Sequence, residues 1–195
     1  ALLLFCGGVQ AQSLLKAAVL VDPGNTKQTG QTFGYRLTYN CSSTSGPCLG
    51  AQVVDLLPIE VQYVSTVSAS PIGDVAAINV TPNFGGSGRT RVQFVMITPL
   101  PAGNSGDLLI NVRFPAGATP NGATATNTAD GINLDTTPGT FTTPPVVVTA
   151  VASTQVNLTK TLQTSPANLD LPETYRLRIS VPNNPGALNL TAIGP

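Results

Sequence analysis

The 195-residue chain has no histidine and no tryptophan, and only 9% of its residues are charged. Without histidine, general acid–base catalysis near neutral pH would depend on a few carboxylates and lysines. Nine basic residues balance nine acidic ones, so the chain cannot form the basic face that nucleic-acid binding requires. We therefore expect that the protein is not an enzyme and does not bind nucleic acid. No group of residues indicates a cofactor.

The first eleven residues are an apolar run that ends in small residues. Val9 and Ala11 fit the pattern that signal peptidase recognises, and the run is too short to span a bilayer. Residues 1–11 are therefore predicted to be part of a signal peptide, which would remove Cys6. A first β-strand of the fold is the alternative interpretation. Because of this signal peptide, we expect an extracellular protein. No other segment is long enough to cross a membrane.

The remaining cysteines, Cys41 and Cys48, flank a turn-rich segment. In an oxidising compartment such a pair is expected to form a disulfide, which would close a short loop and stabilise the fold by about 2.5 kcal/mol. A metal site is the alternative, but the chain has no histidine or further cysteine to complete it.

Alternation of apolar and polar residues predicts an all-β fold. In residues 32–40, for example, Phe33, Tyr35, Leu37 and Tyr39 share one face of a strand. Glycine- and proline-rich turns separate the predicted strands. Seven to nine short strands at this spacing indicate an immunoglobulin-like antiparallel β-sandwich. The strands are expected near residues 13–21, 32–40, 50–57, 60–67, 75–80, 91–96, 107–114 and 122–134.

The chain repeats itself after the first predicted domain. Tyr35-Arg36-Leu37 recurs as Tyr175-Arg176-Leu177, at an offset of 175 − 35 = 140 residues. We therefore expect a complete β-sandwich over residues 12–135, a Thr/Pro-rich linker over 136–151, and the start of a second similar domain over 152–195. Residues 145–151 also fit a strand of either neighbour. Because three strands cannot bury a sandwich core, the protein is expected to continue beyond this sequence.

Several short motifs occur in the order found in one bacterial family. They are Lys16 in the first strand, GQTFGYRLTYN at 30–40, VVDLLP at 53–58, LPAG at 100–103 and ATNTA at 125–129. Together they resemble the conserved repeat domain of large bacterial cell-surface proteins (domain of unknown function 11). The Cys41–Cys48 segment departs from the family, which usually has a Gly-rich turn there. The resemblance implies an immunoglobulin-like sandwich in a secreted, surface-exposed array, and no particular ligand.

Three polar residues lie on faces that are otherwise apolar: Lys16, Asp55 and Asn127. Lys160 does so in the second copy. Burial lowers the pKa of a lysine and raises that of an aspartate. A neutral Lys16 amine would then attack the Asn127 carboxamide, with Asp55 relaying protons, to form an isopeptide bond. Such crosslinks occur in the Gram-positive pilin and adhesin sandwiches that this domain resembles. The alternative is that Lys16 extends to the sandwich edge while Asp55 and Asn127 hydrogen-bond to turns.

Asp130, Asn133 and Asp135 form a weaker candidate site, for Ca²⁺, with an ordinary turn as the alternative. The function predicted overall is a structural spacer or stalk repeat of a bacterial cell-surface or adhesin-like protein, whose partners are neighbouring repeats of the same chain. A module that binds glycan or a partner protein through its loops, and a non-catalytic domain of a secreted enzyme, are the alternatives.

Overall fold

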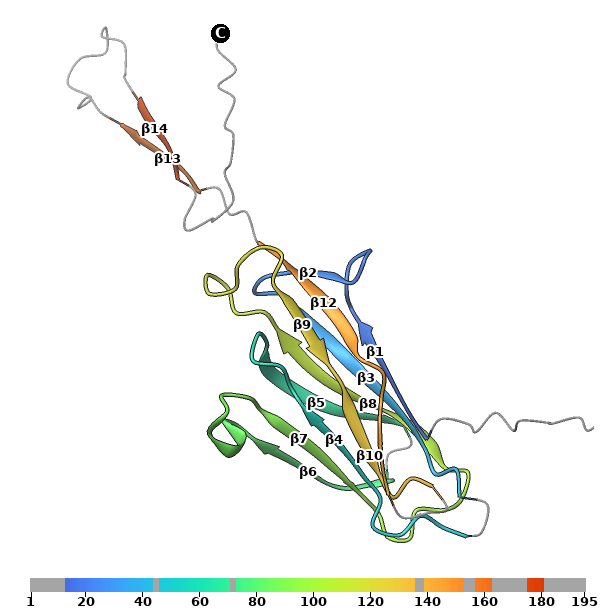
Figure 1. Ribbon diagram of the computed structural model, residues 1–195. Helices are drawn as coiled ribbons and strands as arrows, with labels where there is room; N and C mark the ends of the chain where they lie inside the picture. Colours follow the sequence, from blue (N-terminus) through green and yellow to red (C-terminus); the bar gives the residue numbers. More distant parts are fainter. Residues whose placement is uncertain are drawn as a thin grey trace, which may run out of the picture.

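The computed structural model of the chain describes residues 13–43, 46–70, 73–135, 139–152, 157–162 and 175–180 (Figure 1). The predicted signal peptide, with Cys6 and Ala11, lies outside these residues. All regular secondary structure of the described part is β-strand, apart from the short 3₁₀ helix η1 (Phe84–Gly86), and the described part contains no helix long and apolar enough to span a bilayer. The all-β prediction is confirmed.

Two larger sheets form the sandwich, and a three-stranded sheet closes one side. The first has the order β1 (Leu14–Val19), β3 (Thr32–Asn40), β8 (Ser105–Arg113), β5 (Gln62–Ser70). The second has the order β11 (Thr140–Thr142), β10 (Ala129–Ile132), β4 (Gln52–Leu56), β7 (Arg91–Met96), β6 (Val75–Thr81). The third has the order β2 (Thr26–Gln28), β12 (Val146–Val151), β9 (Thr124–Asn127). All their pairings are antiparallel except that of β12 with β2.

The core lies between the two larger sheets and follows the alternation of the sequence. In β3 the aromatic residues Phe33, Tyr35 and Tyr39 are at most 1% exposed, and every second residue of β7 and β8 is buried with them. Burying each large apolar side chain contributes about 1.5–3 kcal/mol to folding. The period-2 pattern therefore specifies which face of each strand points inward.

The segment expected to be a linker contributes two strands to the first sandwich. Residues 140–142 form β11 beside β10, and residues 146–151 form β12 between β9 and β2. Val148 and Ala150 of β12 are buried in the core. The linker prediction is therefore wrong for residues 140–151, whereas the alternative of a strand over 145–151 agrees with β12, which belongs to the first sandwich. Its Thr and Pro residues suggested an extended chain, but the Val-rich end of the segment carries a buried face that the core requires.

The predicted strand at 122–134 is divided into β9 and β10 at Thr128. β9 pairs with β12, whereas β10 pairs with β4 in the other sheet. The chain thus passes from one sheet to the next at Thr128 (Figure 1). Together with the three-residue strands β2 and β11, this division explains why the sandwich has more strand segments than the seven to nine expected.

Beyond β12, the described residues form one antiparallel pair, β13 (Asn157–Leu162) with β14 (Tyr175–Ser180). Lys160 lies opposite Leu177 in this pair, just as Lys16 lies opposite Leu37 in the pairing of β1 with β3. The sequence offset is therefore accompanied by the same strand register. We interpret β13 and β14 as the counterparts of β1 and β3.

Candidate self-crosslinking site

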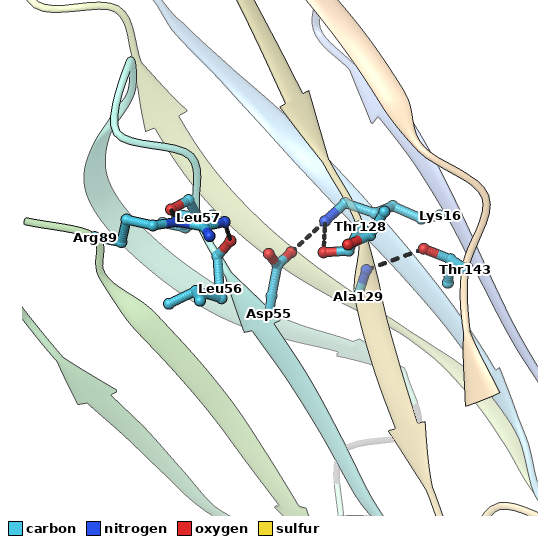
Figure 2. Close-up of polar contacts among 8 residues, drawn as sticks. All are labelled: Lys16, Asp55, Leu56, Leu57, Arg89, Thr128, Ala129 and Thr143. Carbon is cyan, nitrogen blue, oxygen red and sulfur yellow. Dashed lines mark hydrogen bonds and ion pairs between the residues drawn. The ribbon is translucent and has the colours of Figure 1, made fainter. Parts of the chain in front are cut away.

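Lys16 lies in β1, at the edge of the first sheet, and its side chain points into the sandwich. The side chain is 0% exposed, and the partial exposure of the residue comes from its backbone at the sheet edge. Its Nζ lies 2.5 Å from Oδ2 of Asp55 and donates to the backbone carbonyl of Thr128 at 3.0 Å (Figure 2). The sequence left open whether the Lys16 side chain extends to water at the edge of the sandwich. In the structure it points inward.

Asp55 lies in the middle of the second sheet, in β4, between Val92 of β7 and Ala129 of β10. The residue is 0% exposed, and only its Oδ2 has a hydrogen-bond partner. The nearby Arg89 donates to the carbonyls of Leu56 and Leu57, and its charge favours the ionised carboxylate (Figure 2). The alternative interpretation, in which Asp55 hydrogen-bonds to a turn, therefore does not describe this residue, whose hydrogen-bond partner is Lys16.

The backbone acceptor of Lys16 lies where the chain passes from β9 in one sheet to β10 in another. Thr128 lies between β9 and β10, and its carbonyl oxygen accepts the Lys16 hydrogen bond. β10 approaches β1 closely because Gly131 has no side chain: a Cβ there would lie 3.3 Å from Leu14 Cβ and 2.9 Å from Leu134 Cδ1. Thr128 was not among the candidate residues, since a backbone acceptor leaves no signal in the side-chain pattern.

Asn127 is the last residue of β9 and is 1% exposed. Neither Nδ2 nor Oδ1 of its carboxamide has a hydrogen-bond partner. The amide does lie close enough to the Asp55 carboxyl to favour the charged carboxylate. The Asn127 amide is thus a neighbour of the Asp55 carboxyl but does not form a hydrogen bond with it. A buried carboxamide without partners normally costs about 1–3 kcal/mol, so its presence in this core calls for a chemical explanation.

Burial shifts both ionisable groups of the pair toward neutrality. Desolvation lowers the pKa of Lys16, although the charges of Asp55 and Asp130 oppose the shift. Desolvation also raises the pKa of Asp55, against the opposing effect of Lys16. Both shifts favour movement of the shared proton from Nζ to the carboxyl, relative to the same pair in water. That transfer leaves an uncharged amine, which is a nucleophile, in a site with a carboxamide and a proton carrier.

The structure thus places Asp55 beside both of the other residues that the sequence singled out for a crosslink: the Lys16 amine contacts its carboxyl, and Asn127 is a neighbour of the same group. They come from β1, β4 and β9, one strand from each of the three sheets of the sandwich. The chemistry available to them is attack of an amine on a carboxamide, which requires no metal or cofactor.

Tyr35 of β3 also belongs to this site, although the sequence only marked it as a core residue. Nζ of Lys16 lies 4.6 Å from the centre of the Tyr35 ring, in cation–π geometry. The Tyr35 hydroxyl is buried and has no hydrogen-bond partner. Tyr35 lies opposite Ala18, two residues after Lys16 in β1, and because this register is set by strand pairing, no sequence pattern signalled the contact.

The predicted disulfide is present. Sγ of Cys41 lies 2.09 Å from Sγ of Cys48, and both residues are buried. The backbone of Cys48 forms a bridge with Leu100, and Cys41 N donates to the carbonyl of Asn104. The disulfide therefore closes the loop between β3 and β4, and backbone hydrogen bonds of its two cysteines hold that loop against the segment that precedes β8.

The residues of the weaker Ca²⁺ candidate lie in β10 (Asp130) and in the bend that follows it (Asn133 and Asp135). Asp130 Oδ1 accepts from the Thr142 hydroxyl, and Asn133 Oδ1 accepts from the backbone of Gly139. Asn133 has a φ of 53°, a left-handed conformation that asparagine adopts more readily than most residues. Within the described ranges, no group of three or more His, Cys, Asp or Glu side chains is placed to hold a metal ion, and Asp135 has a partner of its own.

Solved bacterial surface proteins have similar folds. They include BcpA, the major pilin subunit of Bacillus cereus (13% identity, TM-score 0.50, 88% of this chain and 53% of that one). The C-terminal domain of the AgI/II polypeptide BspA of Streptococcus agalactiae matches at 16% identity and a TM-score of 0.50, over 70% of this chain and 49% of that one. The N-terminal domain of the Streptococcus gordonii adhesin Sgo0707 matches at 12% identity and 0.50, over 73% and 33%.

The chain spans about half or less of the length of these three structures, and the low identities show the fold alone. No family model and no curated protein matches the sequence. The resemblance to the bacterial repeat family therefore stays a prediction, while the immunoglobulin-like sandwich is the established architecture.

Proposed function

We propose that this chain is a structural spacer of a secreted bacterial surface protein, whose sandwich is locked by an isopeptide bond between Lys16 and Asn127. The observation that carries the proposal is the buried Lys16–Asp55 pair beside a carboxamide that has no hydrogen-bond partner. The disulfide and the fold shared with pilin and adhesin domains support an extracellular location. Neighbouring repeats of the same chain are the proposed partners.

The reaction balances without any further reactant. Lys16 Nζ transfers a proton to Asp55 and then attacks Cγ of Asn127. The new Nζ–Cγ bond forms, the Cγ–Nδ2 bond breaks, and Nδ2 leaves as ammonia after taking up a proton that Asp55 relays from Nζ. The products are a neutral amide, a protonated Asp55 carboxyl and ammonia, in place of an ammonium, a carboxylate and an unpaired carboxamide. Removal of two buried charges favours the product, and escape of ammonia to solvent makes the step irreversible.

The intact mass of the purified chain tests this proposal. After any N-terminal processing is accounted for, we expect the mass to be lower by one ammonia, and a digest to contain a branched peptide joining the segments around Lys16 and Asn127. The variants Lys16→Ala, Asp55→Ala and Asn127→Ala should each have their full calculated mass.

Two matched variants serve as controls. Lys27→Ala changes a lysine of β2 that pairs only loosely with Asp22, at 3.9 Å. Asn111→Ala changes an asparagine that hydrogen-bonds to Ser65. Both should keep the ammonia deficit. A wild-type chain of full mass, with Lys16 and Asn127 recovered in separate peptides, would overturn the crosslink.

A further inference from the structure

The buried polar atoms that lack hydrogen-bond partners are concentrated at one place. Within the described residues they are Tyr35 Oη, Asp55 Oδ1, and Nδ2 and Oδ1 of Asn127. Asp55 contacts the Lys16 amine, and the Tyr35 ring packs beneath it. Buried polar groups in folded proteins are nearly always paired, so a cluster of unpaired ones marks a site whose contacts are incomplete.

A second tyrosine on the same strand shows that Tyr35 is unusual. Tyr39 is equally buried, but its hydroxyl lies 2.8 Å from Oδ2 of Asp74. The Tyr35 hydroxyl has no such acceptor. Burial and the charges of Asp55 and Glu60 raise its pKa, so it stays protonated and is available only as a neutral phenol. Tyr39 therefore has a structural role, whereas the Tyr35 hydroxyl is a donor without an acceptor.

Crosslinking changes the balance of donors and acceptors in this cluster. Before the reaction the unpaired groups are two acceptor oxygens, on Asp55 and Asn127, and two donors, Asn127 Nδ2 and the Tyr35 hydroxyl. The reaction releases Nδ2 as ammonia. Asn127 Oδ1 develops negative charge as the amine attacks and then becomes the oxygen of the new amide. Of the two unpaired donors, only the Tyr35 hydroxyl then remains.

We propose that Tyr35 is a further residue of the crosslinking reaction: its ring positions the Lys16 amine, and its hydroxyl donates to Asn127 Oδ1 while charge develops there. This inference rests on the crosslink proposed above. A preorganised donor to a developing oxyanion in a dry site contributes more than the same donor in water, because no solvent competes for it. The role differs from that of Asp55, which moves protons.

The rate of crosslinking tests the inference. The full chain is synthesised in an oxidising cell-free reaction, chased for set times, and quenched in acid, and the ammonia deficit is measured by mass spectrometry. Tyr35→Phe keeps the ring and should slow the crosslink by roughly a hundred- to a thousandfold, a typical cost for loss of one donor of this kind. Tyr35→Leu loses the ring as well and should be slower still. Tyr39→Phe, the matched control, should react at the wild-type rate per folded molecule.

Two readouts separate this role from a structural one. In the Asn127→Ala background, where no crosslink forms, Tyr35→Phe should leave the thermal midpoint unchanged or raise it, because it removes an unpaired buried hydroxyl. The pH range over which Tyr35→Phe reacts should match that of wild type, since the proton carrier is intact. A Tyr35→Phe chain that reacts at the wild-type rate would overturn the inference and leave the crosslink standing. A wild-type chain that never loses ammonia would instead overturn the proposed function.

Discussion

At the scale of single residues, Lys16 and Asp55 form an ion pair whose side chains are both 0% exposed. A buried pair is weak evidence for stability, because the cost of removing two charges from water offsets most of their attraction. Removing one partner is different, since the other is then left alone in the core. The pair is more easily understood as a reactant than as a stabilising contact.

Because the buried Asp55 would lose its partner, we expect the free energy of unfolding of the Lys16→Met variant to depend on pH. This variant cannot form the crosslink. Burial raises the pKa of Asp55, and the opposing effect of Lys16 is lost in this variant. The native state then keeps a proton that the unfolded state releases above about pH 4. The free energy of unfolding should therefore fall as the pH rises from about 4, by about 1.4 kcal/mol for each unit of pKa shift, and level off above the folded-state pKa.

Denaturant unfolding at a series of pH values checks this expectation. Asn127→Ala is the control, because it also lacks the crosslink but retains Lys16 as a counter-charge. Its unfolding free energy should fall less steeply over the same interval. If the stability of Lys16→Met is flat or increases with pH between 4 and 7, the buried carboxyl does not behave as described.

At the scale of secondary-structure elements, β12 is the strand that the sequence assigned to a linker. It supplies the pairing partner of β9, so it supports the strand that carries Asn127. Val146 lies directly opposite Asn127 in this pairing. The proposed crosslinking site therefore depends on a segment that the sequence left open between a linker and a strand.

Two adjacent residues of β12 provide a matched test. Val148 is 0% exposed, whereas Val147 is 43% exposed. Val148→Asp places a charge without a partner in the core and should destabilise the sandwich by about 3–5 kcal/mol or prevent folding. Val147→Asp should cost less than about 1 kcal/mol. Denaturant unfolding of both variants is the measurement, and equal, small effects would mean that residues 146–151 are not part of this sandwich.

At the scale of the whole molecule, the proposed bond joins the first strand to β9 and closes a loop of 127 − 16 = 111 residues. A covalent closure of this length stabilises a fold by roughly 5 kcal/mol on the chain-entropy model. A spacer that carries tension gains a second property, because the residues inside the loop cannot be extended while the bond is intact.

Single-molecule pulling from the two ends of the chain tests this property. In wild type, the length released on unfolding should lack the contribution of the residues between Lys16 and Asn127. The Asn127→Ala variant should release that length and unfold at a lower force. Lys27→Ala, which leaves the site intact, should behave as wild type. Equal lengths from wild type and Asn127→Ala would contradict a load-resisting crosslink.

Local sequence determined much of this protein. Period-2 alternation was enough to identify the strands of the two larger sheets, apart from β11, and their inward faces, because burial of one face forces that pattern. The same alternation was enough to place Lys16, Asp55 and Asn127 on inward faces. The turn-rich segment between Cys41 and Cys48 was enough to predict their pairing. These properties depend on residues within one strand or one loop.

Only the tertiary structure decided how the sheets combine. The sheet change at Thr128, the recruitment of residues 140–151 into the sandwich, and the packing of Tyr35 against Lys16 all arise from contacts between strands far apart in the sequence. No pattern within one strand specifies such contacts, because they depend on which strands pair and in what register. The sequence therefore predicted the groups of the proposed reaction, and the fold determined what surrounds them.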